Sequence, residues 1–114
     1  MIRAIDKLEP FQKAISKAHL ASAGVSMDAL DTKPIIAVAN SWNEICPGHE
    51  PLKQLAAEVK KGILEAGGEP VEFNTVAMCD GIAQGHSGMR YCLPHREIIT
   101  DSAEAMIVGE GVFD

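Results

Sequence analysis

Ile35-Ile36-Ala37-Val38-Ala39 is a continuous apolar run of strand length. A strand with one solvated face alternates apolar and polar residues, whereas a strand covered on both faces is apolar throughout. The run therefore predicts a buried strand of a parallel sheet that lies between helices. The segment Asp31-Thr32-Lys33-Pro34 precedes it and is typical of a break between elements of secondary structure. The strand is therefore expected to start near Pro34.

The residues after this strand predict a helix and a second strand. The helix is expected from about Glu50 to Ala66, with Pro51 in its first turn and Gly67-Gly68 at its end. Its expected buried face consists of apolar residues at helical spacing: Leu52, Leu55, Ala56, Val59 and Ile63. Residues 70–76 place apolar side chains at alternating positions and predict a strand. Residues 34–76 would then form a βαβ unit, whose crossover is almost always right-handed.

Two more helices are expected outside this unit. Residues 9–22 carry an apolar stripe that includes Phe11 and Ile15, and residues 94–108 carry one that includes Ile99 and Met106. The glycine-rich residues 77–92 between the second strand and the last helix predict a loop. The expected fold class is α/β, with a short parallel sheet flanked by helices.

Composition limits the classes of function. The chain has 114 residues, a net charge of −6 and no basic cluster, so neither nucleic acid nor an anionic membrane is an expected partner. Three cysteines are poorly suited to a disulfide framework and fit a reducing compartment. The first residues lack the basic-then-apolar pattern of a secretory signal. The expected location is the cytoplasm.

The two predicted strands are each followed by a polar loop with possible ligands. Residues 40–49 contain Cys46 and His49, and residues 77–92 contain Cys79 and Asp80. Loops at the carboxyl ends of parallel strands are where α/β proteins bind ligands. A thiol beside a carboxylate offers one soft and one hard metal ligand. The alternative is a small buried thiol followed by an aspartate that caps a turn.

The remaining polar residues of these loops leave alternatives open. His49 and His86 each lie next to a glycine and would either bind an anionic substrate or cap a turn. Arg90 and Arg96 flank the start of the last predicted helix, where an anion is favoured, and the alternative for both is surface ion pairing. Cys92 is expected to be structural.

Together these segments resemble the N-terminal part of the dihydroxy-acid and sugar-acid dehydratase family. The resemblance spans roughly residues 33 to 114, in order. The pieces that carry it are Lys33-Pro34-Ile35-Ile36, Asn40-Ser41-Trp42-Asn43-Glu44, Pro47-Gly48-His49, Glu72-Phe73-Asn74-Thr75, Cys79-Asp80-Gly81-Ile82-Ala83, Gly88-Met89-Arg90-Tyr91 and Arg96-Glu97-Ile98-Ile99. The stretch Ala77 to Gly81, with Gln84-Gly85, also looks like the 6-phosphogluconate dehydratase branch.

The resemblance implies a hydro-lyase that converts a 2,3-dihydroxy acid to a 2-keto acid, as in branched-chain amino-acid biosynthesis. Its implied cofactors are an iron–sulfur cluster and Mg²⁺. By position, Asp80 matches a magnesium ligand and Cys79 matches a cluster ligand of the phosphogluconate branch. In two-iron members the first cluster cysteine aligns with Gly48 rather than Cys46, so a four-iron cluster is the better expectation. Cys46 remains a secondary candidate ligand.

The resemblance covers only about a fifth of a family member. The motif Cys-Asp-Lys of the family, which supplies further ligands, would begin just beyond Asp114, so the expectation is a partial domain that is inactive alone. Family members are usually dimers or larger, which implies a homo-oligomeric parent. The alternatives are a sugar-acid dehydratase, a non-catalytic module that binds a small anion or a partner, and a subunit completed by another chain.

Overall fold

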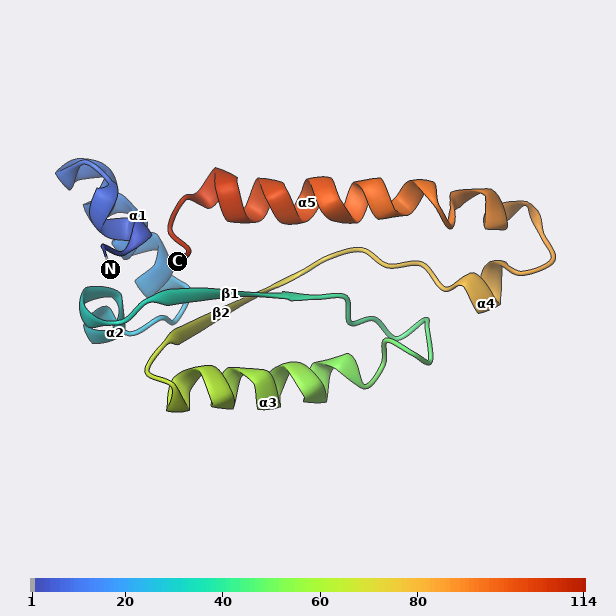
Figure 1. The fold of residues 1–114 in the computed structure, drawn as a ribbon, viewed down its shortest axis with the longest axis horizontal. Helices are drawn as coiled ribbons and strands as arrows, with labels where there is room; N and C mark the ends of the chain where they lie inside the picture. Colours follow the sequence, from blue (N-terminus) through green and yellow to red (C-terminus); the bar gives the residue numbers. More distant parts are fainter. Residues whose placement is uncertain (1) are drawn as a thin grey trace.

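The computed structural model describes residues 2–114 and places helices around a two-stranded sheet (Figure 1). The strands β1 (Ile35–Asn40) and β2 (Glu69–Asn74) are parallel, with Ile35 opposite Glu69 and Asn40 opposite Asn74. The helix α3 (Leu52–Glu65) connects them. The predicted α/β fold class with a short parallel sheet is confirmed. Because the strands are parallel, the loops that follow Asn40 and Asn74 leave the same edge of the sheet.

The end of α3 sets how closely this helix approaches β1. Gly67 has φ +88°, a left-handed conformation that ends the helix and that side chains rarely adopt. At Gly68 a β-carbon would lie 3.0 Å from Ile63 Cγ2 and 3.1 Å from Ile36 Cγ1. The glycine pair therefore both turns the chain and lets the start of β2 pass tightly between α3 and β1.

The other elements lie outside the βαβ unit. They are the 3₁₀ helix η1 (Ala4–Lys7), α1 (Pro10–Ser22), α2 (Met27–Thr32), α4 (Asp80–Ala83), the 3₁₀ helix η2 (Ser87–Tyr91) and α5 (Pro94–Glu110). The region 77–92, predicted to be a loop, thus contains two short helices. The helical turn of α4 is closed by the Ala83 amide, which donates to the Cys79 carbonyl at 3.1 Å. One local turn tolerates Gly81, whereas a longer helix would accumulate the entropic cost of its glycines.

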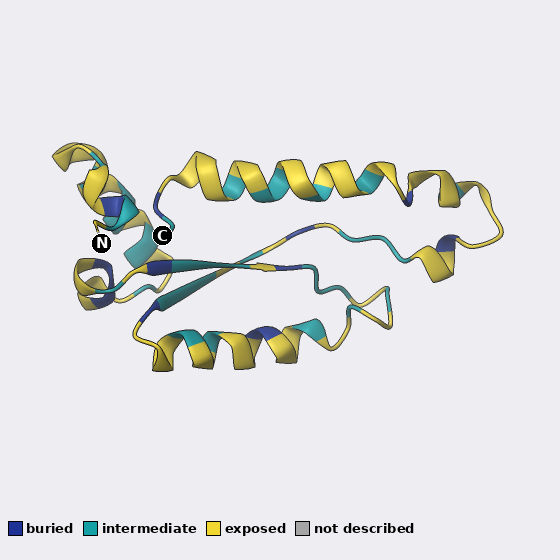
Figure 2. Ribbon diagram, in the orientation of Figure 1, coloured by how far each residue is buried: buried dark blue, intermediate teal, exposed yellow. Residues whose placement is uncertain are grey.

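The hydrophobic core is small and lies at one end of an elongated molecule of 53 × 27 × 25 Å. The core consists of Ile5, Leu30, Ile35 and Val112. It lies at the end of the molecule where Figure 2 colours part of α2 and the start of β1 as buried. Figure 1 shows α3 and α5 on opposite sides of the strands. Among the residues described, α5 has no buried side chain.

Parts of the predicted apolar faces are wrong in detail. Phe11 is 77% exposed, and Leu55 and Val59 of α3 are 56% and 52% exposed. In α3 the side that faces the sheet runs through Leu52, Ala56, Lys60 and Ile63. A sheet of two strands covers only a narrow strip of a helix, so the wider apolar stripe extends beyond it.

Within residues 2–114, no helix combines the length and the apolar character needed to cross a bilayer.

Candidate metal centre

Asparagines tie together the two loops that leave the sheet edge. Asn74 donates to the carbonyls of Asn40 at 2.7 Å and Trp42 at 3.2 Å. The Asn40 side chain donates to Glu72 Oε1 at 2.8 Å and accepts from the Trp42 amide at 2.9 Å. Asn40 is only 7% exposed, so these bonds satisfy a polar group that burial would otherwise penalise. The loop after β1 therefore leaves the sheet in a defined direction.

Asn43 lies further along the same loop and bonds to both loops at once. Its Oδ1 accepts from the amides of Ile45 at 3.0 Å and Cys46 at 2.9 Å. Its Nδ2 donates to the Ala77 carbonyl at 3.0 Å, across to the loop that follows β2. A single side chain thus folds the turn that carries Cys46 and attaches it to the segment that carries Cys79.

The structure brings the thiols of Cys46 and Cys79 together, although they are far apart in the sequence. The neighbouring Cys46 thiol is the largest cause that lowers the pKa of the Cys79 thiol. The backbone N–H groups of Ile82 and Gly81, at the start of α4, lower this pKa further. Both thiols are half-buried and neither forms a disulfide. Lowering the pKa favours the thiolate, the form that binds metals.

Asp80 lies beside this pair and begins α4. Burial raises the pKa of the Cys92 thiol, and the nearby Asp80 carboxylate raises it further. Cys92 is 6% exposed, and its Sγ lies 3.3 Å from Met89 Sδ. Cys92 is therefore a buried neutral thiol, in keeping with a structural role, but it touches the carboxylate of the candidate site.

The histidines and arginines of the loops have mainly local partners. His86 Nδ1 accepts from the Gly88 amide at 3.0 Å while its Nε2 lies 2.9 Å from the Ile82 carbonyl, so this ring caps a turn. A β-carbon at Gly88 would lie 2.6 Å from the His86 ring, which explains the glycine there. His49 Nδ1 lies 3.3 Å from Asn43 Nδ2, within the cysteine-bearing loop. Arg90 Nε donates to the Ser87 carbonyl at 3.1 Å.

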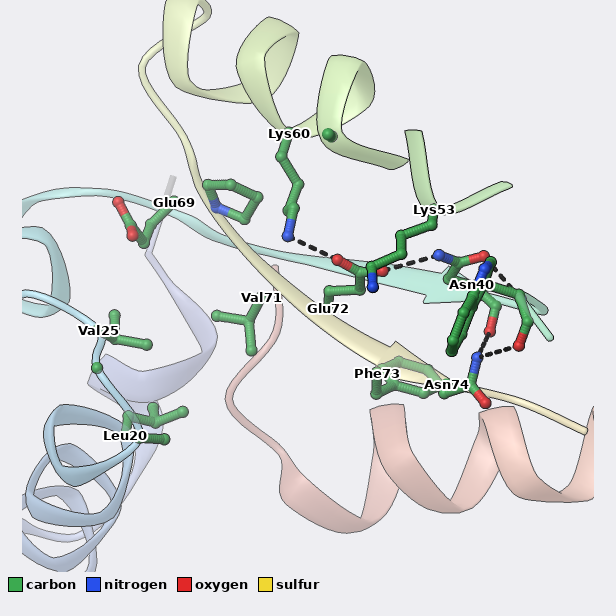
Figure 3. Close-up of a pocket in the computed structure, with 15 residues that line it drawn as sticks. Leu20, Val25, Asn40, Lys53, Lys60, Glu69, Val71, Glu72, Phe73 and Asn74 are labelled. Carbon is green, nitrogen blue, oxygen red and sulfur yellow. Dashed lines mark hydrogen bonds and ion pairs between the residues drawn. The ribbon is translucent and has the colours of Figure 1, made fainter. Parts of the chain in front are cut away.

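A groove of about 870 Å³ runs beside β2 and away from the cysteines (Figure 3). It is lined by the end of α1, by α3 and by the whole of β2. Lys60 Nζ pairs with Glu72 at 2.6 Å, and Lys53 Nζ lies 4.9 Å from the centre of the Trp42 ring. The pKa of Glu72 is lowered by the hydrogen bond from Asn40 and then by Lys60. Lys60 and Glu72 therefore neutralise each other within the groove rather than presenting a free charge to a ligand.

The residues present fit part of a metal site. Two facing thiols match the soft ligands that iron–sulfur clusters use, and the adjacent Asp80 carboxylate matches the hard ligands of Mg²⁺. Within residues 2–114 no group of three or more His, Cys, Asp or Glu side chains converges on a position for one metal ion. Two thiols and one carboxylate therefore form a partial ligand set.

Sequence reasoning missed the bridging role of Asn43 and the nearness of Cys92 to Asp80. Asn43 had a usable signal, since asparagines in a loop that leaves a strand often bond to backbone amides two or three residues later. Cys92 had none, because its contact with Asp80 depends on how η2 folds back toward α4.

Comparison with known proteins places the chain among dehydratases. The family model for the dihydroxy-acid/6-phosphogluconate dehydratase N-terminal region matches residues 33–114. "Dihydroxy-acid dehydratase 1" of Methanosarcina acetivorans is 51% identical over 107 residues, which cover 94% of this chain and 19% of that protein. "Dihydroxy-acid dehydratase" of Ignicoccus hospitalis is 61% identical over 75 residues, 66% of this chain and 14% of that protein. That of Pyrococcus abyssi is 47% identical over 96 residues, 84% of this chain and 17% of that protein.

The chain spans about a fifth of the length of the curated relatives that it matches. The resemblance read from residues 33 to 114 is confirmed, since the family model covers the same residues. This chain belongs to the dihydroxy-acid/6-phosphogluconate dehydratase family.

Proposed function

We propose that this chain supplies the N-terminal part of the active site of a dihydroxy-acid dehydratase. The reaction is the removal of water from a 2,3-dihydroxy acid to give a 2-keto acid, as in branched-chain amino-acid biosynthesis. The observation that carries the proposal is the pairing of Cys46 with Cys79 next to Asp80 at the carboxyl edge of a parallel sheet. Support for the substrate class comes from the relatives, which are named for dihydroxy acids.

In this proposal Cys79 is a thiolate ligand of an iron–sulfur cluster, of the four-iron type rather than the two-iron type. Cys46 is a second thiolate beside it, and Asp80 is a ligand of Mg²⁺. A Lewis-acidic metal takes the charge of a departing hydroxide, and a hard cation favours an enolate-like charge on the acid. The lowered pKa of the Cys79 thiol favours metal binding, because a metal ion binds the thiolate and less free energy is needed to remove the proton.

The neutral Cys92 thiol acts on the carboxylate side of the site. Its pKa is raised by burial and by the nearby Asp80 carboxylate, so it keeps its proton beside the proposed Mg²⁺ ligand. Asp80 is exposed at the start of α4, where a carboxylate has no competing ion pair among the salt bridges of residues 2–114.

The further ligands and the substrate-binding groups come from protein outside these residues, so the chain alone should not turn over substrate. We propose a homo-oligomeric parent enzyme in the cytoplasm, where three free cysteines would stay reduced. A sugar-acid substrate is the second candidate, because the family model covers the 6-phosphogluconate branch as well. A non-catalytic anion-binding module is less favoured, since the relatives carry enzyme names.

Anaerobic reconstitution of the purified chain with iron and sulfide tests the metal part of the proposal. We expect bound iron and sulfide with visible absorption in the wild-type chain, and their loss in Cys79→Ser. The Cys92→Ser variant is the matched control and should keep the iron. Equal iron and sulfide binding in wild type and Cys79→Ser would contradict the proposal.

A chimera tests the activity. Residues 33–114 would replace the matching segment of the Methanosarcina acetivorans relative, with which this chain shares 51% identity. Dehydration of a branched 2,3-dihydroxy acid should persist in the chimera and fall on the order of a hundredfold or more with Asp80→Asn. A folded chimera that dehydrates only a phosphorylated sugar acid would favour the second candidate.

A further inference from the structure

We propose that Asn43 is the positioning residue that holds the Cys46 and Cys79 thiols at one place, so that both can bind a single metal centre. The metal part of this inference rests on the proposed function, whereas the pairing of the thiols does not. Asn43 itself touches neither thiol in the hydrogen bonds of residues 2–114 and acts through the backbone of each loop.

The two ends of the Asn43 amide have separate tasks. Oδ1 accepts from the Cys46 amide at 2.9 Å and from the Ile45 amide at 3.0 Å, which closes the turn that carries the first thiol. Nδ2 donates to the Ala77 carbonyl at 3.0 Å, two residues before the second thiol. Since Asn43 is half-buried, water replaces these bonds poorly when the side chain is removed.

The other bonds between the two loops lie closer to the sheet. Asn74 donates to the carbonyls of Asn40 and Trp42, and the Ser41 and Thr75 hydroxyls lie 2.8 Å apart. They hold the loops where the strands end, but the chain continues for several more residues to each thiol. The Asn43–Ala77 bond is the outermost of these ties among the described residues, so it controls how far apart the thiol-bearing segments can move.

This arrangement leads to a test that needs no metal. Diamide removes two hydrogens from a pair of thiols, forms the S–S bond and is itself reduced to the hydrazide. The rate of a Cys46–Cys79 disulfide, followed by peptide mapping, therefore measures how often the two thiols meet. We expect this rate to fall on the order of tenfold in Asn43→Ala, because small displacements of reacting groups have large effects on rate.

Two further variants separate positioning from general stability. Asn43→Asp keeps an oxygen that accepts from the Cys46 amide but cannot donate to the Ala77 carbonyl, so it should slow the disulfide while the Cys46 amide stays protected from hydrogen exchange. Asn74→Ala removes two ties near the sheet and leaves those of Asn43 intact, so its rate should stay within about twofold of wild type. Slow alkylation of buried Cys92 reports that each variant is folded. If Asn43→Ala does not fold, the result for Asn43→Asp alone decides whether Asn43 positions the thiols.

The outcomes for the two proposals are distinct. If folded Asn43→Asp forms the disulfide as fast as wild type, or if Asn74→Ala slows it equally, Asn43 is not the positioning residue. After anaerobic reconstitution, wild type should hold iron more tightly than Asn43→Asp by about 10- to 100-fold, the usual effect of a residue that orients metal ligands. If Asn43→Asp slows the disulfide while wild type and Cys79→Ser bind iron equally, the role of Asn43 is supported and Cys79 is not a cluster ligand.

Discussion

Asp114 bonds to Ile35 through both its backbone and its side chain. The Asp114 amide donates to the Ile35 carbonyl at 2.9 Å, and Asp114 Oδ2 accepts from the Ile35 amide at 2.9 Å. Oδ1 of the same carboxylate accepts from the Ala4 amide at 2.6 Å. One residue therefore joins the start of β1, the segment after α5 and the N-terminal 3₁₀ helix. These bonds lie on the edge of β1 that faces away from β2. On the other edge the Glu69 amide donates to the Pro34 carbonyl.

Replacing Asp114 should loosen this junction. Asp114→Ala removes an acceptor from two backbone amides and is expected to lower the free energy of unfolding by about 1–3 kcal/mol. The stability of Asp114→Asn should lie between those of wild type and Asp114→Ala, because its amide oxygen accepts from one backbone amide while its NH₂ group faces the other. Urea denaturation measures the change. Asp101→Ala, which removes an exposed carboxylate from α5, is the control and should be nearly neutral.

The small core makes Leu30 an important residue. Leu30 is fully buried in α2 against Ile5, Ile35 and Val112. Leu30→Ala should lower the free energy of unfolding by about 2–5 kcal/mol, the usual cost of a cavity in a packed core. The matched variant Leu55→Ala on α3, at a position that is 56% exposed, should lower the free energy of unfolding by less than about 1 kcal/mol. Equal effects in the two variants would show that the core lies elsewhere.

Asp6 should make the N-terminal region sensitive to acid. Hydrogen bonds from Arg3 and then from Lys13 lower the pKa of Asp6 from 3.8 to about 2. A carboxylate with a lowered pKa stabilises the fold at neutral pH and loses this contribution as the pH falls from 3.8 toward 2. Asp6→Asn should therefore be less stable than wild type at neutral pH, and the difference should shrink over this range. A difference that stays constant on acidification would rule out this ion pair as the cause.

The thiols should react in a fixed order with iodoacetamide. Cys79 has a lowered pKa and is half-buried, whereas the Cys92 pKa is raised by burial and by Asp80. Because the thiolate is the nucleophile, Cys79 should be alkylated faster than Cys92, by on the order of tenfold or more near neutral pH. Mass spectrometry of the alkylated peptides gives both rates in one sample. Faster labelling of Cys92 would show that its loop opens.

Much of the fold could be predicted from local patterns. The apolar run from Ile35 correctly predicted a strand, but its coverage on both faces is incomplete, since the middle of β1 is half-buried, Ala39 is exposed and α5 buries no side chain. The glycines after Ala66 marked the end of α3. Burial was predicted less well, because the width of the covered strip on each helix depends on the number of strands beneath it. Val59 of α3 is exposed for this reason.

The candidate site divides in the same way. Cys79, Asp80 and Cys46 could be selected from the sequence because each follows a predicted strand and has a side chain suited to metals. The histidines could not be resolved, and the structure shows that the His86 ring caps the turn at Gly88.

The sequence by itself determined the βαβ unit, the two loops at its edge and the residue types that those loops present. These are consequences of periodicity, of backbone freedom at glycine and of parallel topology, all of which are local or nearly so. Only the tertiary structure decided that Cys46 faces Cys79, that Asp80 meets Cys92 and that Asn43 joins the two loops. Such contacts depend on the path of each loop in space, which is set by hydrogen bonds between residues more than thirty positions apart.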